Sequence, residues 1–309
     1  MITAQGLTKR YGAKTAVNAI NFDIKPGLVT GFLGPNGAGK STTMRMIVGL
    51  DRPSSGSVTV NGRQYADHAA PLREVGALLD AKAVHTGRSA YNHLLAMGAT
   101  HGIGKARVNE VIGMTGLDSV AGKRVGGFSL GMGQRLGIAA ALLGDPATLI
   151  LDEPVNGLDP DGVLWVRNLV RSLATEGRTV FLSSHLMSEM ALTADHLIVL
   201  GRGSIIADAP IAEILAAATG SSVKLRSPQA SALAQVLAAP GITITASGVD
   251  TLTIAGITAA EVGEAAARNA IPLHELTPGS ASLEQAYMQL TENDVEYQTL
   301  TSADMEVAR

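Results

Sequence analysis

The sequence predicts an α/β fold with a large domain on a mostly parallel sheet and a small α+β domain after it. In the first two-thirds of the chain, short apolar runs alternate with segments of helical periodicity, a pattern typical of strands joined by crossover helices. Strand signals disappear between residues 88 and 128, so we expect a helical subdomain there. Near residue 220 the alternation starts again. The predicted divisions are a large domain at 1–219, a small domain at 220–291 and an acidic tail at 292–309.

The elements of the large domain follow from local patterns. Ile20, Phe22 and Ile24 alternate with polar residues, as in a strand with one buried face. An apolar run at 28–33 leads into a glycine-rich turn and then into a helical pattern at 40–50. The remaining elements are expected as buried strands at 148–151 and 179–183 and a helix around 165–173.

The small domain is predicted to have the element order β-α-β-β-α-β, which is the ferredoxin-like arrangement. A further helix is expected at 282–290, before the acidic tail. The strands are expected at 223–226, 242–245, 252–254 and 271–276, and the helices at 230–238 and 259–269.

Composition narrows the function classes. Aromatic residues make up only 3% of the chain and the formal charge is −3, which argues against a nucleic-acid partner. Cysteine is absent, so disulfides and thiol catalysis are excluded, as fits a cytoplasmic protein. The first residues do not have the pattern of a signal peptide, and no apolar run has the length of a membrane span. We therefore expect any membrane role to be exercised through a partner.

A glycine-rich segment matches the phosphate-binding loop, or P-loop. It reads GPNGAGKST over residues 34–42, fits the pattern G-x-x-x-x-G-K-[ST], and lies between a predicted strand and a predicted helix. Its glycines let the backbone wrap a phosphate chain, which the positive end of the following helix faces. Lys40 is then expected to reach the β- and γ-phosphates, and the Ser41 hydroxyl to ligate Mg²⁺. The predicted nucleotide-binding residues of this loop are Gly34, Asn36, Gly37, Ala38, Gly39, Lys40, Ser41 and Thr42.

Two carboxylates follow the predicted strand at 148–151. Asp152 is placed to hold Mg²⁺ through water, and Glu153 to orient and deprotonate an attacking water. Two acids at the end of a strand are, taken alone, more often caps or solvated residues. The P-loop upstream favours the interpretation as the catalytic end of an ATPase site.

These motifs, in this order, resemble the ATP-binding-cassette (ABC) family of ATPases, which carries a serine–glycine signature before the carboxylate strand. The segment FSLGMGQR at 128–135 stands in that place, and its Ser129 and Gly131 match the signature. The resemblance implies that this helix start binds the γ-phosphate of ATP held by a second subunit, which a helix N-terminus can do. Two positions depart from the family pattern: Leu130 replaces a glycine, and Met132 replaces a glutamine that makes amide hydrogen bonds.

Four further positions take roles from the same resemblance. Asp159 lies in the family's loop after the second carboxylate, where it would contact the dimer partner and also cap a helix. His185 resembles the family's switch histidine, which contacts the γ-phosphate. Tyr11 resembles the aromatic residue that stacks on adenine. Asp80 occupies the place of a glutamine that touches Mg²⁺ and signals to the membrane subunit. We expect its carboxylate to face the metal ion; the alternative is a solvent-facing cap.

The signature, Asp80 and the final helix, SLEQAYMQLT at 282–291, are similar to one subgroup of the family. It comprises bacterial ATPases that pair with separate membrane proteins in bacitracin- and daunorubicin-type drug exporters. The resemblance implies a homodimer with two shared ATP sites, bound to an integral membrane subunit at the inner face of the cell membrane. Each site would combine residues of both chains. One chain would supply Lys40, Ser41, Asp152, Glu153 and His185, and the other Ser129 and Gly131.

Two other classes of protein remain as alternatives. One is a soluble ABC ATPase of translation or DNA maintenance, although such proteins usually carry two cassettes or long coiled coils, and neither is visible here. The other is an unrelated P-loop kinase or GTPase, but the guanine-selecting N-K-x-D motif is absent. The transported compound is not predicted, because its recognition lies mainly in the membrane partner.

Overall fold

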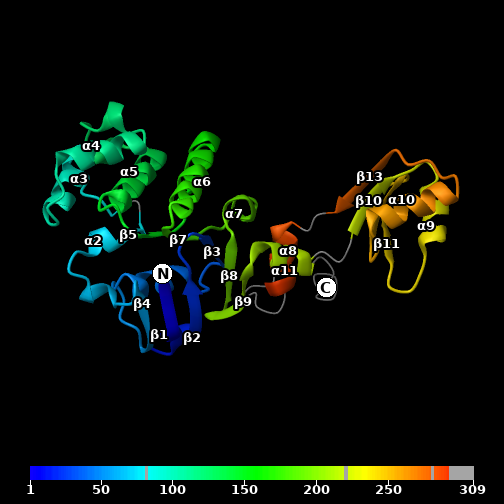
Figure 1. Cartoon of the computed structure of the whole chain (residues 1–309), viewed down its shortest axis with the longest axis horizontal. Helices are drawn as coiled ribbons and strands as arrows, with labels where there is room; N and C mark the ends of the chain where they lie inside the picture. The colour runs from blue at the N-terminus through cyan, green and yellow to red at the C-terminus, as the bar shows by residue number, and fades with distance from the viewer. Residues whose placement is uncertain (81–82, 219–221, 280–281, 292–309) are drawn as a thin grey trace, which may run out of the picture. The chain divides into compact units, whose positions relative to one another are not determined.

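The computed structural model describes residues 1–80, 83–218, 222–279 and 282–291 (Figure 1). The acidic tail predicted at 292–309 lies outside the described residues. Contacts between residues divide the described chain into two compact units, one holding Met1–Ile211 and the other Ala212–Leu290. None of the described helices is both long and apolar enough to cross a bilayer.

The first unit is built on a central sheet in which all strands are parallel except the last. Every residue of β3 (Val29–Leu33), β6 (Thr148–Leu151) and β7 (Thr179–Ser183) is buried, as expected for strands covered on both faces. The strand at the far edge, β9, runs antiparallel to β8. The strand order is β5 (Val75–Leu78), β6 (Thr148–Leu151), β7 (Thr179–Ser183), β3 (Val29–Leu33), β8 (His196–Gly201) and β9 (Ser204–Pro210).

A smaller antiparallel sheet packs against this one in the order β2 (Lys14–Ile24), β1 (Ile2–Tyr11) and β4 (Ser55–Val60). The alternation of Ile20, Phe22 and Ile24 does bury one face of β2, and these side chains belong to a core cluster with central-sheet residues. The ring of Phe22 lies 6.3 Å from those of both Phe32 and Phe181. This shared core holds the strand that precedes the P-loop rigidly in place.

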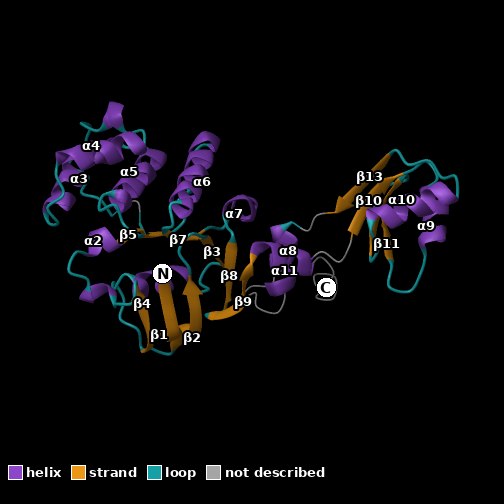
Figure 2. Cartoon of the chain, viewed as in Figure 1, coloured by secondary structure: helices purple, strands orange, loops and turns teal. Residues whose placement is uncertain are grey.

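A group of packed helices lies beyond the edge strand β5 (Figure 2). The helical subdomain expected at 88–128 contains α3 (Ala90–Ala99) and α4 (Lys105–Met114), which pack against each other. The helix α5 (Leu130–Leu142) packs against both of them and also against β5, so it links this subdomain to the sheet. The other helices of this unit are α1 (Lys40–Ile47), α2 (Pro71–Glu74), α6 (Pro160–Thr175) and α7 (Met187–Thr193).

The second unit has the predicted order β-α-β-β-α-β, with a sheet arranged as β11-β12-β10-β13. One boundary was wrong, because the strand expected at 271–276 begins only at Glu275. The cause lies at Pro272, which has no N–H for a sheet ladder and whose carbonyl accepts a hydrogen bond from the Ser227 side chain at 2.8 Å. The elements are α8 (Ile211–Ala218), β10 (Ser222–Arg226), α9 (Ala230–Leu237), β11 (Thr243–Ala246), β12 (Thr251–Ala255), α10 (Ala259–Arg268), β13 (Glu275–Gly279) and α11 (Leu283–Thr291).

Candidate active site

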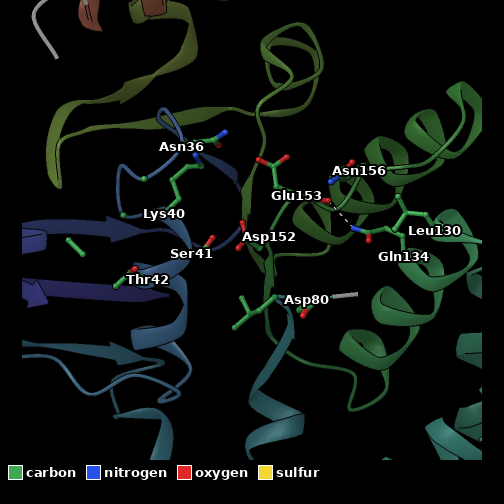
Figure 3. Close-up of a pocket in the computed structure, with 14 residues that line it drawn as sticks. Asn36, Lys40, Ser41, Thr42, Asp80, Leu130, Gln134, Asp152, Glu153 and Asn156 are labelled. Atoms are coloured by element: carbon green, nitrogen blue, oxygen red, sulfur yellow. Dashed lines mark hydrogen bonds between the residues drawn. The ribbon is translucent and has the colours of Figure 1, made fainter. Parts of the chain in front are cut away.

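The residues that follow β5, β6 and β3 in the central sheet line one cavity of about 420 Å³. The carboxyl ends of parallel strands are where α/β proteins form their sites. Asp80 follows β5, Asp152 and Glu153 follow β6, His185 follows β7, and the P-loop follows β3. The predicted residues that line the cavity are Asn36, Gly37, Gly39, Lys40, Ser41, Thr42, Asp80, Asp152 and Glu153 (Figure 3).

The P-loop is held in shape by its glycines and by its own lysine. Gly39 has φ 108°, and a Cβ atom there would come within 2.5 Å of the Ala16 carbonyl oxygen. A Cβ atom on Gly34 would lie 2.7 Å from the Leu200 carbonyl oxygen. The Lys40 Nζ atom donates to the carbonyl of Gly34 at 2.6 Å. The backbone therefore forms a tight cradle at the start of α1, which is suited to a phosphate chain.

Lys40 is the buried cation of the cavity, with an exposed fraction of 9%. Burial lowers the pKa of its ammonium group, and the carboxylates of Glu153 and Asp152 act against that change. A partly desolvated cation next to an open cavity attracts an anion more strongly than a solvated one, because less water screens the interaction.

The Asp152 carboxylate and the Glu153 backbone are both tied to the next strand through a single hydroxyl that the sequence analysis did not identify. Ser183, the last residue of β7, donates to Asp152 Oδ1 at 2.5 Å and accepts from the Glu153 backbone N–H at 2.9 Å. Glu153 has φ 50°, a left-handed conformation that costs a residue other than glycine about 1–3 kcal/mol. Strain of this kind persists only where the surroundings enforce it, and Ser183 supplies one of those restraints.

The side chains of Glu153 and His185 are in direct contact. The His185 Nδ1 atom lies 2.7 Å from Glu153 Oε2, and the backbone N–H of His185 donates to the same oxygen at 3.3 Å. The exposed fractions are 26% for the carboxylate and 55% for the imidazole. With its Nδ1 atom directed at the carboxylate, the ring keeps Nε2 available for another partner.

The segment predicted as a signature forms the start of α5. The Ser129 Oγ atom accepts from the Met132 backbone N–H at 3.2 Å, so Ser129 is the expected N-cap. Ser129 and Gly131 are not among the residues that line the cavity of their own chain, whereas Leu130 and Gln134 are. Gln134 lies in the signature segment at 128–135, but nothing in the sequence of that segment indicated a role for it.

Besides Ser129 and Gly131, the predicted residues that lie outside the cavity lining are Gly34, Ala38, Asp159, Tyr11 and His185. Asp159 caps α6 by accepting from the Gly162 backbone N–H at 2.9 Å. The hydroxyl of Tyr11 donates to Asp51 at 3.1 Å, and the Lys9 Nζ atom lies 5.0 Å from the centre of the Tyr11 ring. His185 reaches the cavity through Glu153. Further lining residues that the sequence analysis did not select are Ala16, Leu79 and Asn156. Asn156 lies in the same loop after the second carboxylate as Asp159.

The oxygen atoms of the cavity suit a magnesium-bound nucleotide. The hydroxyl of Ser41 and the carboxylates of Asp80 and Asp152 line the same space. Among the described residues, no three acidic or histidine side chains lie close enough together to hold a metal ion by themselves. One or two carboxylates together with substrate phosphates is the usual protein environment of Mg²⁺, so the donor set fits that ion.

Three models of protein families match parts of the chain. The model described as "ABC transporter" matches residues 17–156. One described as "AAA domain, putative AbiEii toxin, Type IV TA system" overlaps it at 124–191. A domain of unknown function matches residues 221–284, within the second unit.

Several curated proteins are similar to most of the chain. The bacitracin transport ATP-binding protein of Bacillus licheniformis is 42% identical over 213 residues, covering 68% of this chain and 70% of that protein. The lantibiotic transport ATP-binding protein of Streptococcus pyogenes is 38% identical, with coverages of 67% and 89%. The linearmycin resistance ATP-binding protein of Bacillus subtilis is also 38% identical, with coverages of 67% and 68%.

Solved structures share the fold. A dimeric bacterial ABC transporter cassette superposes with a TM-score of 0.64 at 24% sequence identity, covering 68% of this chain and 99% of that one. A subunit of an ABC transporter complex from Clostridium perfringens superposes with a TM-score of 0.61 at 28% identity, covering 70% and 90%.

Proposed function

The chain belongs to the family of ATP-binding subunits of ABC transporters, and on that premise we propose that it hydrolyses ATP to drive export of an antibiotic-like compound through a separate membrane protein. The observation that carries the proposal is the meeting of a P-loop lysine, a hydroxyl and two carboxylates at one cavity formed by neighbouring strand ends. Because these strands pack in a shared core, the groups are preorganised for a triphosphate.

Binding of ATP is assigned to the P-loop. Its backbone N–H groups and the start of α1 would hold the phosphates, and the Lys40 ammonium group would move from the loop's own carbonyl to the β- and γ-phosphates. Ser41 and Asp152 would hold Mg²⁺, with Asp80 facing it from β5. The ion supplies charge neutralisation to the transferring phosphoryl group.

Hydrolysis is assigned to Glu153. Its carboxylate would orient a water molecule in line with the γ-phosphate and take its proton. The 2.7 Å contact with His185 would hold that carboxylate in place and leave Nε2 of the ring directed toward the phosphate. The charge that develops on the phosphoryl oxygens would be stabilised by the Lys40 ammonium group, whose buried position at the cavity leaves little water to screen the interaction.

Each active site is proposed to form between two copies of this chain. In support, Ser129 and Gly131 open α5 but do not line the cavity of their own chain. The N-terminal end of that helix is suited to a phosphate group presented from outside. Asp159 would contribute to the same interface. Closure of the homodimer on ATP and its opening after hydrolysis would drive the membrane subunit at the inner face of the membrane.

The class of transported compound is proposed from the relatives, which are named for transport of bacitracin and a lantibiotic and for resistance to linearmycin. The test is to purify the tagged chain from membranes of its own cells and to identify any membrane protein that purifies with it. Inside-out vesicles that hold both proteins should then accumulate such a compound only with ATP. Full ATP hydrolysis by the chain without any co-purified membrane protein or any vesicle uptake would contradict the exporter assignment and leave the ATPase assignment standing.

A further inference from the structure

Gln134 connects the helix α5 to the backbone of the proposed catalytic carboxylate. Its Nε2 atom donates to the Glu153 carbonyl oxygen at 2.8 Å (Figure 3). The Gln134 side chain is almost fully buried, with an exposed fraction of 4%. Removal of this donor would leave a carbonyl oxygen at the edge of the cavity without the hydrogen bond that the structure gives it.

A second residue of α5, Leu130, contacts the loop that connects β6 to α6. Leu130 precedes Gln134 by four positions, so the two side chains lie on one face of the helix. The Leu130 side chain fills the space in which a Cβ atom of Gly157 would lie, and Gly157 has φ 75°. The loop that begins at Glu153 is therefore held against α5 at both ends, by a hydrogen bond and by an apolar contact.

The conformation of Glu153 depends on restraints of this kind. Its left-handed φ of 50° is sterically unfavourable for a residue with a Cβ atom. The backbone N–H is held by Ser183 at 2.9 Å and the carbonyl by Gln134 at 2.8 Å. With both flanking peptide groups tied, the direction of the Cα–Cβ bond is determined, and with it the direction of the carboxylate.

We propose that Gln134 is a positioning residue for ATP hydrolysis, which fixes the Glu153 peptide so that the carboxylate points at the attacking water. The inference rests on the proposed function of Glu153. Ser129, the N-cap of α5, is assigned to the ATP of the partner chain, so the hydrogen bond also ties the Glu153 backbone of one site to the helix that serves the other.

The test is the substitution Gln134→Met, which keeps the length and helix propensity of the side chain and removes the donor. Misplacement of a catalytic group by about 1 Å can cost about 100-fold in rate, so kcat is expected to fall by about 10- to 100-fold. KM for ATP should stay close to the wild-type value, and the melting temperature should fall by only a few degrees, because one buried hydrogen bond is lost. Gln229→Met makes the same chemical change at an exposed position of the second unit and should leave all three unchanged.

A double-mutant cycle separates positioning from a general structural role. If Gln134 acts through Glu153, adding Gln134→Met to Glu153→Gln should not lower the residual single-turnover rate further. Equal losses in both backgrounds, or a normal kcat in folded Gln134→Met, would overturn the inference. Should Gln134→Met not fold, Gln134→Asn, whose amide is one methylene short of the carbonyl, gives the same two outcomes. Normal hydrolysis by Glu153→Gln alone would instead contradict the proposed function.

Discussion

The Nδ1 atom of His185 lies 2.7 Å from the Oε2 atom of Glu153, although the two residues are 32 positions apart in the sequence. They meet because β6 and β7 are parallel neighbours, so the residues that follow each strand emerge at the same edge of the sheet. The contact fixes the orientation of the Glu153 carboxylate and directs the Nδ1 atom of the imidazole at it. It makes the pair, and not either residue alone, the functional unit of the proposed site.

Replacement of His185 should therefore slow hydrolysis without weakening ATP binding. In His185→Ala the Glu153 carboxylate loses its side-chain partner, and we expect kcat to fall by about 100-fold, within the range of acid–base contributions. The affinity for ATP should change little, because the P-loop remains intact. Steady-state hydrolysis and calorimetric ATP titration measure the two effects. His101→Ala, at a position remote from the cavity lining, is the control.

The lowered pKa of Lys40 predicts a pH dependence of ATP binding. Only the protonated ammonium group attracts phosphate, and burial moves its pKa below the ordinary value of 10.5. As pH rises through that lowered pKa the charge is lost, so ATP affinity should begin to fall at a pH below 10.5. Lys40→Ala should bind about 10- to 100-fold more weakly at neutral pH. Titrations across pH should show no corresponding fall in the variant.

Asp80 should set the requirement for Mg²⁺. If its carboxylate faces the ion, Asp80→Ala should raise the Mg²⁺ concentration needed for half-maximal hydrolysis, and Asp80→Gln, which restores an amide oxygen, should retain much of the activity. The measurement is a Mg²⁺ titration of the hydrolysis rate with and without the membrane partner. Identical curves for wild type and Asp80→Ala in both conditions would make Asp80 a surface cap.

Sharing of sites between chains is tested by mixing two inactive variants. In a dimer of one Ser129→Arg chain and one Lys40→Ala chain, both lesions fall in one site and the other site is intact. Some hydrolysis should therefore return when the variants are mixed. Mixed dimers that are shown to form and yet remain inactive would contradict the composite site.

Much of the first unit could be predicted because its strands are local, strongly apolar segments. The runs at 148–151 and 179–183 became β6 and β7 without any change of boundary. Burial on both faces removes alternation from such strands, and the flanking polar residues then mark their ends. The strand expected at 271–276 was misplaced because one proline and one side-chain hydrogen bond determined where the ladder begins.

The contacts of the site were less predictable than its residues. Motif spacing identifies Lys40, Asp152 and Glu153, because the P-loop pattern and a pair of acids after a buried strand are both visible in a short stretch of sequence. No local pattern indicates that Gln134 donates to the Glu153 carbonyl or that Ser183 joins the Asp152 carboxylate to the Glu153 backbone N–H. These bonds depend on the relative position of a helix and two strands, which only the folded structure defines.

Hydrolysis by Glu153→Gln tests the central claim most directly. The amide is nearly the same size as the carboxylate but cannot accept a proton, so the variant should bind ATP normally and remain as an ATP-dependent dimer. We expect its single-turnover rate to fall by about 100-fold or more, as for loss of a general base. Gel filtration with ATP and a quenched-flow assay of phosphate release measure both properties. A wild-type rate of phosphate release in this variant would contradict the assignment of Glu153 as the base.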